Sequence, residues 1–349
     1  MSHDRPTRNS ALDPKRLRTG LLVVVGIGIS AGIVVALLTD GPAVLAGIAK
    51  LPPMWLALAL ALSASAWLGQ GLGFAALLER GIRGNLLRMT RAFLGGDFPA
   101  LVTPFGSGGI PGGIYCLTRE GLTTGEASAV ITMHSLLTGA FFVVAGAASA
   151  LLLPLQSAGS SAVVWGSLAA VVAGVGAIVW VALRPRRATA FLHRMLCSRA
   201  TQRILGHDRS ERLAAGAERE ARQFAASVSL LLRERPGSLA LSFLGLFSSR
   251  MALVVTLPVI MYGLGWRGAL LPLLATAVGA LALGIVSPTP GGSGAVEAAL
   301  TALLATQTDA PTAAAAALLW RGITYYAEVL AGWAAFSSYI ARGRKARAV

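Results

Sequence analysis

Several titratable and charged side chains lie inside stretches of sequence that are otherwise apolar. They are Asp97, His134, Arg250, Glu297, Arg321 and Glu328. An ionisable group is costly to hold in hydrocarbon, so in a membrane segment it usually pairs with a partner or lines a path for a ligand. The mixture of carboxylates and guanidinium groups therefore predicts either buried ion pairs or the binding of a charged headgroup.

The last apolar stretch, residues 312–341, carries three polar side chains at helical spacing. Tyr325 lies four residues after Arg321, and Glu328 lies seven after it, so all three share one helix face. Arg321 and Glu328 could pair across helices with Glu297 and Arg250, which would make them structural. They could equally hold a lipid headgroup, with the arginines on its anionic part and the glutamates balancing that charge or binding a cationic moiety.

Asp97 and His134 complete the candidate set. Asp97 lies beside a break in a helix and could cap it. His134 could be a hydrogen-bonded packing residue or a proton relay. The candidate substrate-binding residues are thus Arg250, Glu297, Arg321, Tyr325, Glu328, Asp97 and His134.

Two breaks rich in glycine and proline interrupt the apolar sequence, at Thr103–Gly109 and Ser287–Gly294. Glycine permits close approach and left-handed backbone, and proline prevents the helical ladder from continuing. A helix that restarts inside the membrane offers free N–H groups to a phosphate or carboxylate. The alternative is that these small residues only permit tight helix crossings. The predicted backbone and hinge positions are Pro104, Gly106, Gly108, Gly109, Pro288, Pro290, Gly291, Gly292 and Gly294. Glu297 follows on the first turn of the second restarted helix, where an ordinary helix cap would also place an acid.

Motifs for a metal, a cofactor or catalysis are missing from the sequence. No zinc-ligand spacing and no Walker loop occurs, and the glycine clusters do not follow a strand. The two cysteines, Cys116 and Cys197, are not expected to form a disulfide, because the second lies in a basic loop expected to face the reducing cytoplasm. We therefore predict no metal, no cofactor and no enzymatic activity.

Composition decides the fold class. Of the 349 residues, 55% are apolar and only 13% are charged, about half the charged share of a soluble domain. The formal net charge is +15, and 26 of the 30 lysines and arginines lie at the ends and loops of apolar blocks, as cytoplasmic loops do. This placement argues against nucleic-acid binding and favours anionic lipids as partners. The sequence predicts an all-α polytopic membrane protein.

The apolar blocks set the expected helices. Seven are of spanning length: 20–38, 52–78, 123–153, 160–183, 236–262, 268–287 and 312–341. Two further elements, 92–119 and 288–306, are broken or re-entrant, because such backbone is tolerated only where protein or a cavity satisfies it.

Charge placement divides the chain and orients it. The predicted regions are a basic cytoplasmic N-terminus 1–19, a transmembrane half 20–183, a basic amphipathic linker 184–235, a second transmembrane half 236–341 and a basic tail 342–349. The positive-inside rule places both termini in the cytoplasm. It also requires two hairpins that enter from opposite faces. The two broken elements could be an inverted repeat, which is common in transporters.

Three sequence phrases, Thr103–Gly109, Arg119–Leu122 and Pro288–Ala299, resemble a known family. They are similar to the flippase-like family typified by the transmembrane domain of lysylphosphatidylglycerol synthase. The family pattern of Pro-Gly-Gly, Gly and Glu-Ala, followed later by an arginine with aromatics, is matched by Pro290, Gly291, Gly292, Gly294, Glu297, Ala298, Arg321 and Tyr325.

This resemblance implies movement of an anionic or lipid-linked headgroup between leaflets of the inner membrane. Aminoacyl-transferring relatives carry a soluble domain after the last span, so that activity is not expected in a chain ending at Val349. Two alternatives stay open, a non-transporting scaffold for a lipid-modifying partner enzyme and an ion-coupled carrier of small solutes. Cargo, direction and oligomeric state do not follow from the sequence.

Overall fold

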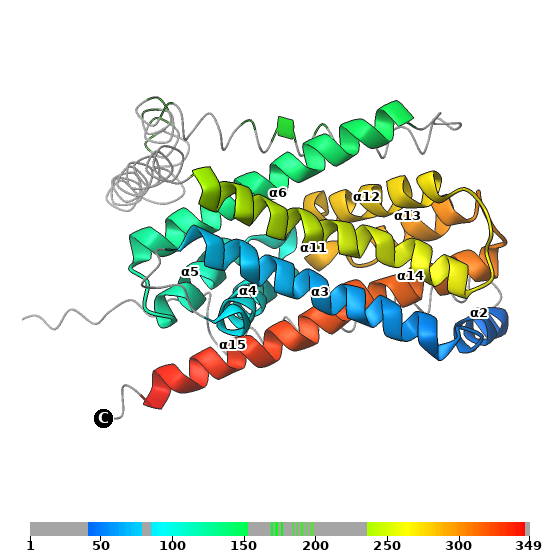
Figure 1. The fold of residues 1–349 in the computed structure, drawn as a ribbon, viewed down its shortest axis with the longest axis horizontal. Helices are drawn as coiled ribbons and strands as arrows, with labels where there is room; N and C mark the ends of the chain where they lie inside the picture. Colours follow the sequence, from blue (N-terminus) through cyan, green and yellow to red (C-terminus); the bar gives the residue numbers. More distant parts are fainter. Residues whose placement is uncertain are drawn as a thin grey trace, which may run out of the picture.

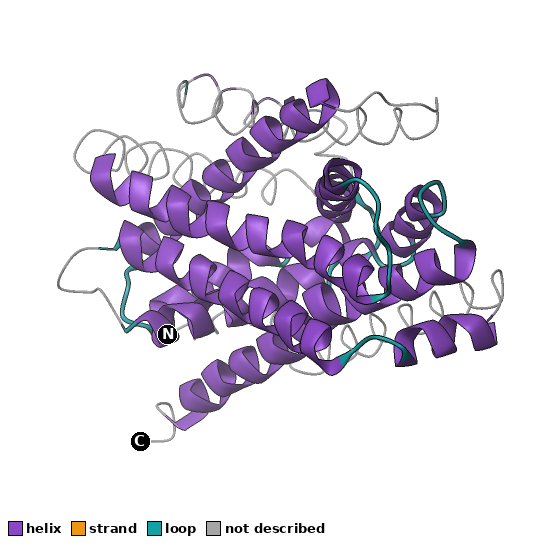
Figure 2. Ribbon diagram, turned by 45° about the vertical axis from the view of Figure 1, so that its right-hand side comes forward, coloured by secondary structure: helices purple, strands orange, loops and turns teal. Residues whose placement is uncertain are grey.

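The computed structural model describes residues 41–78, 85–152 and 236–345, with isolated residues between 169 and 197. Every regular element in these ranges is helical (Figure 2), as the sequence predicts. The predicted elements that fall wholly or mostly outside them are the N-terminal segment 1–19, the spans 20–38 and 160–183, the linker 184–235 and the end of the tail 342–349.

Three of the described helices are long and apolar enough to cross a membrane. They are α3 (Pro53–Leu77), α6 (Thr124–Leu152) and α11 (Pro236–Gly263). Helices α3 and α11 begin with proline, whose missing N–H is not needed in the first turn. The amide of Thr123 donates to Glu126 Oε2 at 2.8 Å, which fixes the start of α6. These helices confirm three of the predicted spans.

The two other apolar blocks within the described residues differ from the prediction. Residues 268–287 form α12 (Leu270–Val286), whose 17 residues are fewer than the roughly 20 that hydrocarbon requires. Residues 312–341 are divided into α14 (Ala310–Arg321), a π-helical turn η4 (Gly322–Tyr326) and α15 (Ala327–Lys345). A short helix that was not predicted, α2 (Gly41–Ala49), precedes α3. Three of the roughly seven predicted spanning-length helices are thus present in the part of the chain that is described.

The first broken element is a helical hairpin. Helix α4 (Leu86–Leu101) leads through a 3-10 turn, η2 (Pro104–Gly106), into α5 (Gly109–Arg119). Its two helices approach so closely that only glycine fits between them, because a Cβ on Gly96 would lie 2.7 Å from Gly113 Cα. Helix α4 starts earlier than the predicted element 92–119. Its start is capped by Asn85, whose side chain accepts a hydrogen bond from the amide of Leu87 at 3.0 Å.

The second broken element forms a similar hairpin from the other end of the bundle. Helix α12 leads through the 3-10 turn η3 (Pro290–Gly292) into α13 (Ala295–Leu304). In Figure 1, α4 and α5 occupy the end near the C-terminus, whereas α12 and α13 occupy the opposite end beside α2. The two tips, η2 and η3, are in contact. The hairpins therefore meet inside the helix bundle, tip to tip.

Helices α3 and α11 form the most extensive packing in the bundle and run along its length (Figure 1). Small residues bring them together, since a Cβ on Gly69 would lie 2.6 Å from the carbonyl oxygen of Gly245. Leucines of α3 such as Leu56, Leu60 and Leu68 remain exposed, as expected of a surface that faces lipid. Each hairpin packs against this pair of helices, the first through contacts of α4 with α3 and the second through contacts of α12 with α11.

Candidate functional site

The two hairpin tips repeat a short sequence and its backbone. Residues 103–108 and 289–294 both read Thr-Pro-X-Gly-Ser-Gly. In the first tip Phe105 has φ 53° and ψ 21°, and in the second Gly291 has φ 56° and ψ 17°. The glycines that follow them have φ of 63° and 73°. The backbones then diverge at the serines, so the likeness covers the turn itself.

A buried ion pair lies directly behind the second tip. Arg321 Nε donates to Glu297 Oε1 at 2.9 Å, and its NH2 group donates to the carbonyl of Gly291 at 3.0 Å. The hydroxyl of Tyr326 donates to the same carboxylate oxygen at 3.1 Å, and the amide of Gly294 donates to Oε2 at 2.8 Å. The two side chains are only 1% and 6% exposed. We call Glu297 and Arg321 the closed pair, because their polar atoms are used within the protein. The sequence analysis left this pairing open beside the binding of a lipid headgroup.

The π-helical turn places two tyrosines against this pair. The wider turn brings both Tyr325 and Tyr326 to the side of Arg321, whose guanidinium carbon lies 4.0 Å from the centroid of the first ring and 5.8 Å from the second. The hydroxyl of Tyr325 lies 2.9 Å from the carbonyl oxygen of Leu101 and 3.3 Å from that of Pro290. Tyr325 therefore joins the two tips. Single π turns are frequent at functional sites.

The helix starts at the tips are capped by the chain's own side chains. The amide of Gly108 donates to Thr103 Oγ1 at 2.8 Å, and the amide of Gly294 donates to Glu297 as above. The glycines permit these turns, since a Cβ on Gly108 would lie 2.4 Å from the carbonyl oxygen of Pro99. The donors expected to hold a phosphate at these two positions are thus bonded internally.

The other predicted hinge residues are also structural in their contacts. Pro104 and Pro290 each begin a 3-10 turn, and Pro288 follows Ser287, which has the extended backbone that precedes proline. Gly109 faces Ala100 across the first hairpin, and a Cβ on Gly109 would lie 2.9 Å from the Cβ of Ala100. These residues shape the tips and leave ligand binding to other side chains.

Three charged side chains gather around the middle of α11. Arg250 lies at the centre of that helix, Asp97 comes from α4 and Glu328 from α15. The charge of Arg250 acts on both carboxylates, and the carboxylates act on each other. Arg250 Nε is buried without a hydrogen-bond partner. In the described part of the chain, no ion pair or hydrogen bond joins these three side chains, and each keeps partial exposure. We call Asp97, Arg250 and Glu328 the open cluster.

His134 lies next to the open cluster and within reach of the charge of Arg250. Its Nε2 lies 2.6 Å from Gln70 Oε1 and donates a hydrogen bond to it. The side chain of Gln70, on α3, therefore orients the imidazole. The rings of Phe74 and Phe93 flank the imidazole at 5.0 and 6.0 Å. This supports the packing interpretation of His134, and Gln70 is a partner that the sequence analysis missed.

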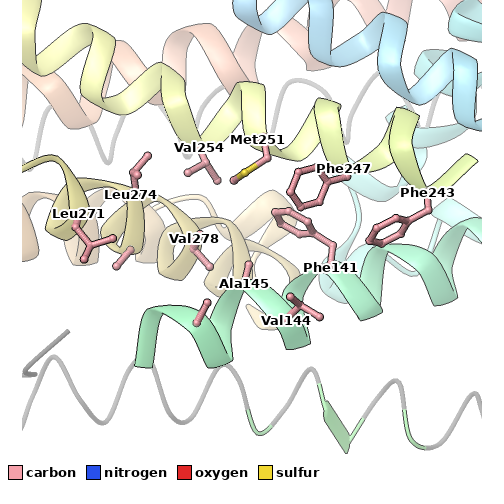
Figure 3. A pocket seen from close by; sticks show the side chains of 12 residues that line it. Phe141, Val144, Ala145, Phe243, Phe247, Met251, Val254, Leu271, Leu274 and Val278 are labelled. Carbon is pink, nitrogen blue, oxygen red and sulfur yellow. The ribbon is translucent and has the colours of Figure 1, made fainter. Parts of the chain in front are cut away.

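An apolar cavity of about 270 Å³ lies between α6, α11 and α12 (Figure 3). Figure 3 shows side chains from α6, α11 and α12 turned toward it, including Phe141, Phe247 and Met251. Phe141 stacks edge-on against Phe142, whose ring in turn lies 6.0 Å from the guanidinium carbon of Arg250. The lining comprises Phe141, Val144, Ala145, Ala148, Phe243, Phe247, Met251, Val254, Leu271, Leu274, Ala275 and Val278.

A third ionic group, at the end of the first hairpin, was not predicted. Glu120 accepts from Arg88 Nε at 2.8 Å, from Arg91 at 3.0 Å and from the hydroxyl of Tyr339 at 2.7 Å. Burial alone would raise the pKa of Glu120, but hydrogen bonds from Tyr339, Arg88 and Arg91 outweigh it and lower that pKa. This group ties α4 and α5 to α15. The sequence analysis treated the arginines of residues 80–91 only as loop charges that orient the chain, so it did not predict this pairing.

The spanning-length apolar helices indicate a polytopic membrane protein, and its described part contains two opposed helical hairpins that meet at their tips. The chain belongs to the family of the lysylphosphatidylglycerol synthase transmembrane region, whose model matches residues 23–332. The match is to the transmembrane region of that synthase, and no match to its catalytic domain is found. No curated protein matches the chain.

The structure divides the predicted site residues between two places. Glu297, Arg321 and Tyr325 lie together behind the second tip, and Asp97, Arg250 and Glu328 surround the middle of α11. His134 lies beside the second group. Tyr326 was missed, because an ordinary α-helix would not bring two consecutive tyrosines onto the same partner. In the described residues, no group of three or more histidines, cysteines or acids could hold a metal ion.

Proposed function

We propose that this protein binds the phosphate-bearing headgroup of a membrane lipid at the open cluster and moves the lipid between the two leaflets. The observation that carries the proposal is Arg250, a guanidinium in the middle of a spanning-length helix whose Nε is buried and unbonded. A buried charged donor without a partner is costly to maintain. A phosphate that accepts a hydrogen bond from Arg250 would offset this cost, which is why we expect a ligand there.

Phosphate fits Arg250 better than it fits Arg321. A guanidinium offers a planar fork of N–H donors that matches phosphate oxygens. Arg321 directs its donors to Glu297 and Gly291, so a phosphate there would have to displace a complete internal network. We therefore assign Arg250 to the headgroup and Arg321 to the scaffold that holds the second tip.

The surroundings of Arg250 suit an amphiphile. Phe142 lies under its guanidinium, and Phe141, in contact with Phe142, lines the apolar cavity. A charged group and an apolar cavity on neighbouring faces of α11 match the two parts of a lipid. Acyl chains would lie along the cavity side while the headgroup reaches the open cluster.

The opposed hairpins support alternating access. In known transporters, binding sites lie between repeated broken helices near mid-membrane, and one repeat moves against the other. The shared turn of η2 and η3, and the entry of the hairpins from opposite ends, agree with an inverted repeat. We place the chain in the bacterial inner membrane with both termini cytoplasmic, where the basic end of α15 meets anionic headgroups.

The test uses the full chain reconstituted into phosphatidylglycerol-containing vesicles with a fluorescent phosphatidylglycerol. Dithionite bleaches only the outer leaflet, so protein-dependent movement appears as bleaching beyond half of the signal. We expect Arg250→Gln to abolish this movement, because the phosphate loses its charged donor. Arg267→Gln is the matched control, since Arg267 is an exposed loop arginine that donates to the carbonyls of Tyr262 and Trp266.

The outcomes separate the rival functions. Unchanged lipid movement in a folded Arg250→Gln protein would contradict the proposal. Wild-type protein that binds lipid without moving it would favour a scaffold that serves a lipid-modifying enzyme. Flux of a water-soluble solute that depends on His134 would favour an ion-coupled carrier.

A further inference from the structure

The second hairpin tip is firmly attached to the helices behind it. Arg321 donates to the carbonyl of Gly291 at 3.0 Å. The amide of Gly294 donates to Glu297 at 2.8 Å, and Gly292 between these two glycines is buried. Because these bonds tie the turn to the closed pair, we expect the second tip to move only together with the helices that carry that pair.

The first tip is held much more loosely. Its turn is exposed from Pro104 to Ser107. A Cβ on Gly106 would have its nearest neighbouring atom 3.8 Å away, so the backbone there has room. The side chain of Thr103 accepts the amide of Gly108 at 2.8 Å, but this bond lies within the hairpin itself. The first hairpin can therefore keep its own turn while it changes its position against the second.

One hydroxyl group joins the two tips. Tyr325 Oη lies 2.9 Å from the carbonyl oxygen of Leu101 and 3.3 Å from that of Pro290. Leu101 is the last residue of α4, and the last carbonyls of a helix have no partner within it. A phenol has one proton to donate, so the hydroxyl can bond fully to only one hairpin at a time. The guanidinium of Arg321, 4.0 Å from the ring centroid, keeps the ring beside the second tip.

Phe105, in the first tip, has a strained backbone. Its φ of 53° and ψ of 21° are left-handed, a conformation that is unfavourable for a bulky residue and suits glycine. The matching residue of the second tip is Gly291. The side chain of Phe105 is 67% exposed, so packing of its ring gives little in return. Such strain persists only while the surrounding structure imposes it. The strain therefore favours separation of the tips, and the hydrogen bond from Tyr325 opposes it.

We propose that the first hairpin is the element that moves, that the second stays fixed, and that Tyr325 is the latch between them. The latch rests on the proposed function, because it names the hairpin that opens a path for the lipid. In the closed latch, Tyr325 bonds to Leu101 and Phe105 is strained. In the open latch, the hydroxyl turns to Pro290, the first tip separates from the second and the strain at Phe105 is released. Tyr325 is thus a positioning residue that sets the balance between two arrangements of the hairpins.

The test measures the position of each tip in the full chain, reconstituted into phosphatidylglycerol-containing vesicles. Pulsed electron paramagnetic resonance gives the distance between two spin labels attached to introduced cysteines. Ser65, exposed on α3, carries the reference label, and it is paired either with Ser107 in the first tip or with Ala295 at the start of α13. Cys197 is replaced by serine in every sample, and Cys116 is kept because it is buried.

Tyr325→Phe keeps the ring and removes the hydroxyl. We expect the share of a second, longer distance from the Ser107 label to rise about fivefold, the effect of losing one hydrogen bond. The distance to the Ala295 label should not change, because the second tip stays attached. Adding Phe105→Gly to Tyr325→Phe removes the strain as well and should return the distances toward those of the wild type.

Tyr326→Phe is the matched control. Tyr326 is the neighbouring tyrosine, and its hydroxyl donates to Glu297 within the second tip's own network. Its removal should leave the Ser107 distance unchanged. A second comparison needs only folded Phe105 variants. Phe105→Gly should unfold at a higher temperature than Phe105→Ala, because alanine keeps the left-handed strain and glycine does not.

Failure of the latch differs from failure of the proposed function. An unchanged Ser107 distance in folded Tyr325→Phe, or an equal change in Tyr326→Phe, would overturn the latch. Movement of the Ala295 label as large as that of Ser107 would show that the second tip is not fixed. If Tyr325→Phe does not fold, the Phe105 variants decide, and Phe105→Gly no more stable than Phe105→Ala would overturn the stored strain. Distances that change as expected in a wild-type background that moves no phosphatidylglycerol would overturn the proposed function and leave the latch intact.

Discussion

The closed pair and the open cluster contain the same kinds of side chains in opposite states. Glu297 and Arg321 form a direct ion pair whose oxygens and nitrogens also bond to tyrosine and backbone. The open cluster has one more carboxylate, yet in the described residues none of its three side chains is bonded to another. Buried charge alone therefore does not identify a binding site. The unused bonding capacity of Arg250 is the reason why we propose the open cluster, rather than the closed pair, as the ligand site.

The two groups also differ in what surrounds them. The closed pair is attached to the second tip through Gly291 and Gly294, so it holds the hairpin turn in place. The open cluster draws one side chain from each of α4, α11 and α15, which belong to different parts of the bundle. A group assembled from separate helices can change when those helices move, whereas the closed pair moves as one unit with its tip.

Removing one partner of the closed pair should have the largest effect. Arg321→Ala leaves Glu297 buried without its cation, and breaking such a pair costs about 3–5 kcal/mol. We expect a strong loss of folded protein, measured as the thermal unfolding midpoint in detergent and the yield of monodisperse protein on size exclusion. An Arg321→Ala protein with wild-type stability but no lipid movement would instead place Arg321 in the headgroup site.

Gly291 tests how closely the second tip is fitted to this pair. A Cβ at this position would lie 2.1 Å from the ring of Tyr325, and φ is +56°. The left-handed backbone and the overpacking together should cost about 3 kcal/mol in Gly291→Ala.

Gly106→Ala is the matched control in the first tip. Its φ is +63°, but the nearest atom to its Cβ would be 3.8 Å away. Only the backbone cost, about 1–2 kcal/mol, should appear there. Equal loss in both variants, measured as unfolding midpoints, would mean that the second tip is no more tightly held than the first.

Sequence reasoning located the helices well and the contacts less well. The spanning helices could be read from runs of leucine and alanine, and the breaks from glycine and proline, because these are local properties. The pairing of Glu297 with Arg321 was one of the possibilities that the sequence left open, because Glu328 and Arg250 also lie in apolar surroundings and could have been the partners. Counting the positive charges of the loops predicted two hairpins that enter from opposite faces, but the contact between their tips comes from the structure.

The bonding state of each charged group could not be predicted. Arg250 and Arg321 look alike in sequence, since each is a single arginine in an apolar helix. Their difference depends on Glu297 being brought to Arg321 by a turn with left-handed glycines, and on a π turn that adds Tyr326. Gln70 beside His134 and Glu120 beside Tyr339 are likewise contacts across 64 and 219 residues. Such contacts are set by helix packing, which a single sequence does not reveal.

The ionic group around Glu120 lies outside the spanning-length helices, and its arginines are more exposed than Arg321, so its loss should cost less stability than loss of the closed pair. Because its pKa is lowered in the folded chain, its contribution is present at neutral pH and is lost as the pH falls below about 4.3 through the folded value. Tyr339→Phe removes one hydrogen bond to Glu120 and should cost about 1 kcal/mol at pH 7. Unfolding midpoints measured from pH 7 down to about pH 2 should converge for the two proteins, and a constant difference would show that Glu120 is not the partner responsible.

The smallest effect on stability is expected when a glutamate of the open cluster is replaced by glutamine. Glu328→Gln replaces a carboxyl group with a neutral amide of the same shape, and Glu328 makes no ion pair or hydrogen bond within the described residues. Because Asp97 still balances Arg250, stability at pH 7 should stay within about 0.5 kcal/mol of the wild type, the range of substitutions that break no bond. Glu297→Gln is the matched comparison, since it removes a charge that Arg321 needs and should cost about 3–5 kcal/mol. Thermal unfolding of both variants at pH 7 gives the contrast directly. A loss in Glu328→Gln as large as that in Glu297→Gln would show that both carboxylates of the open cluster are charged at rest and that Arg250 is held by them rather than waiting for a phosphate.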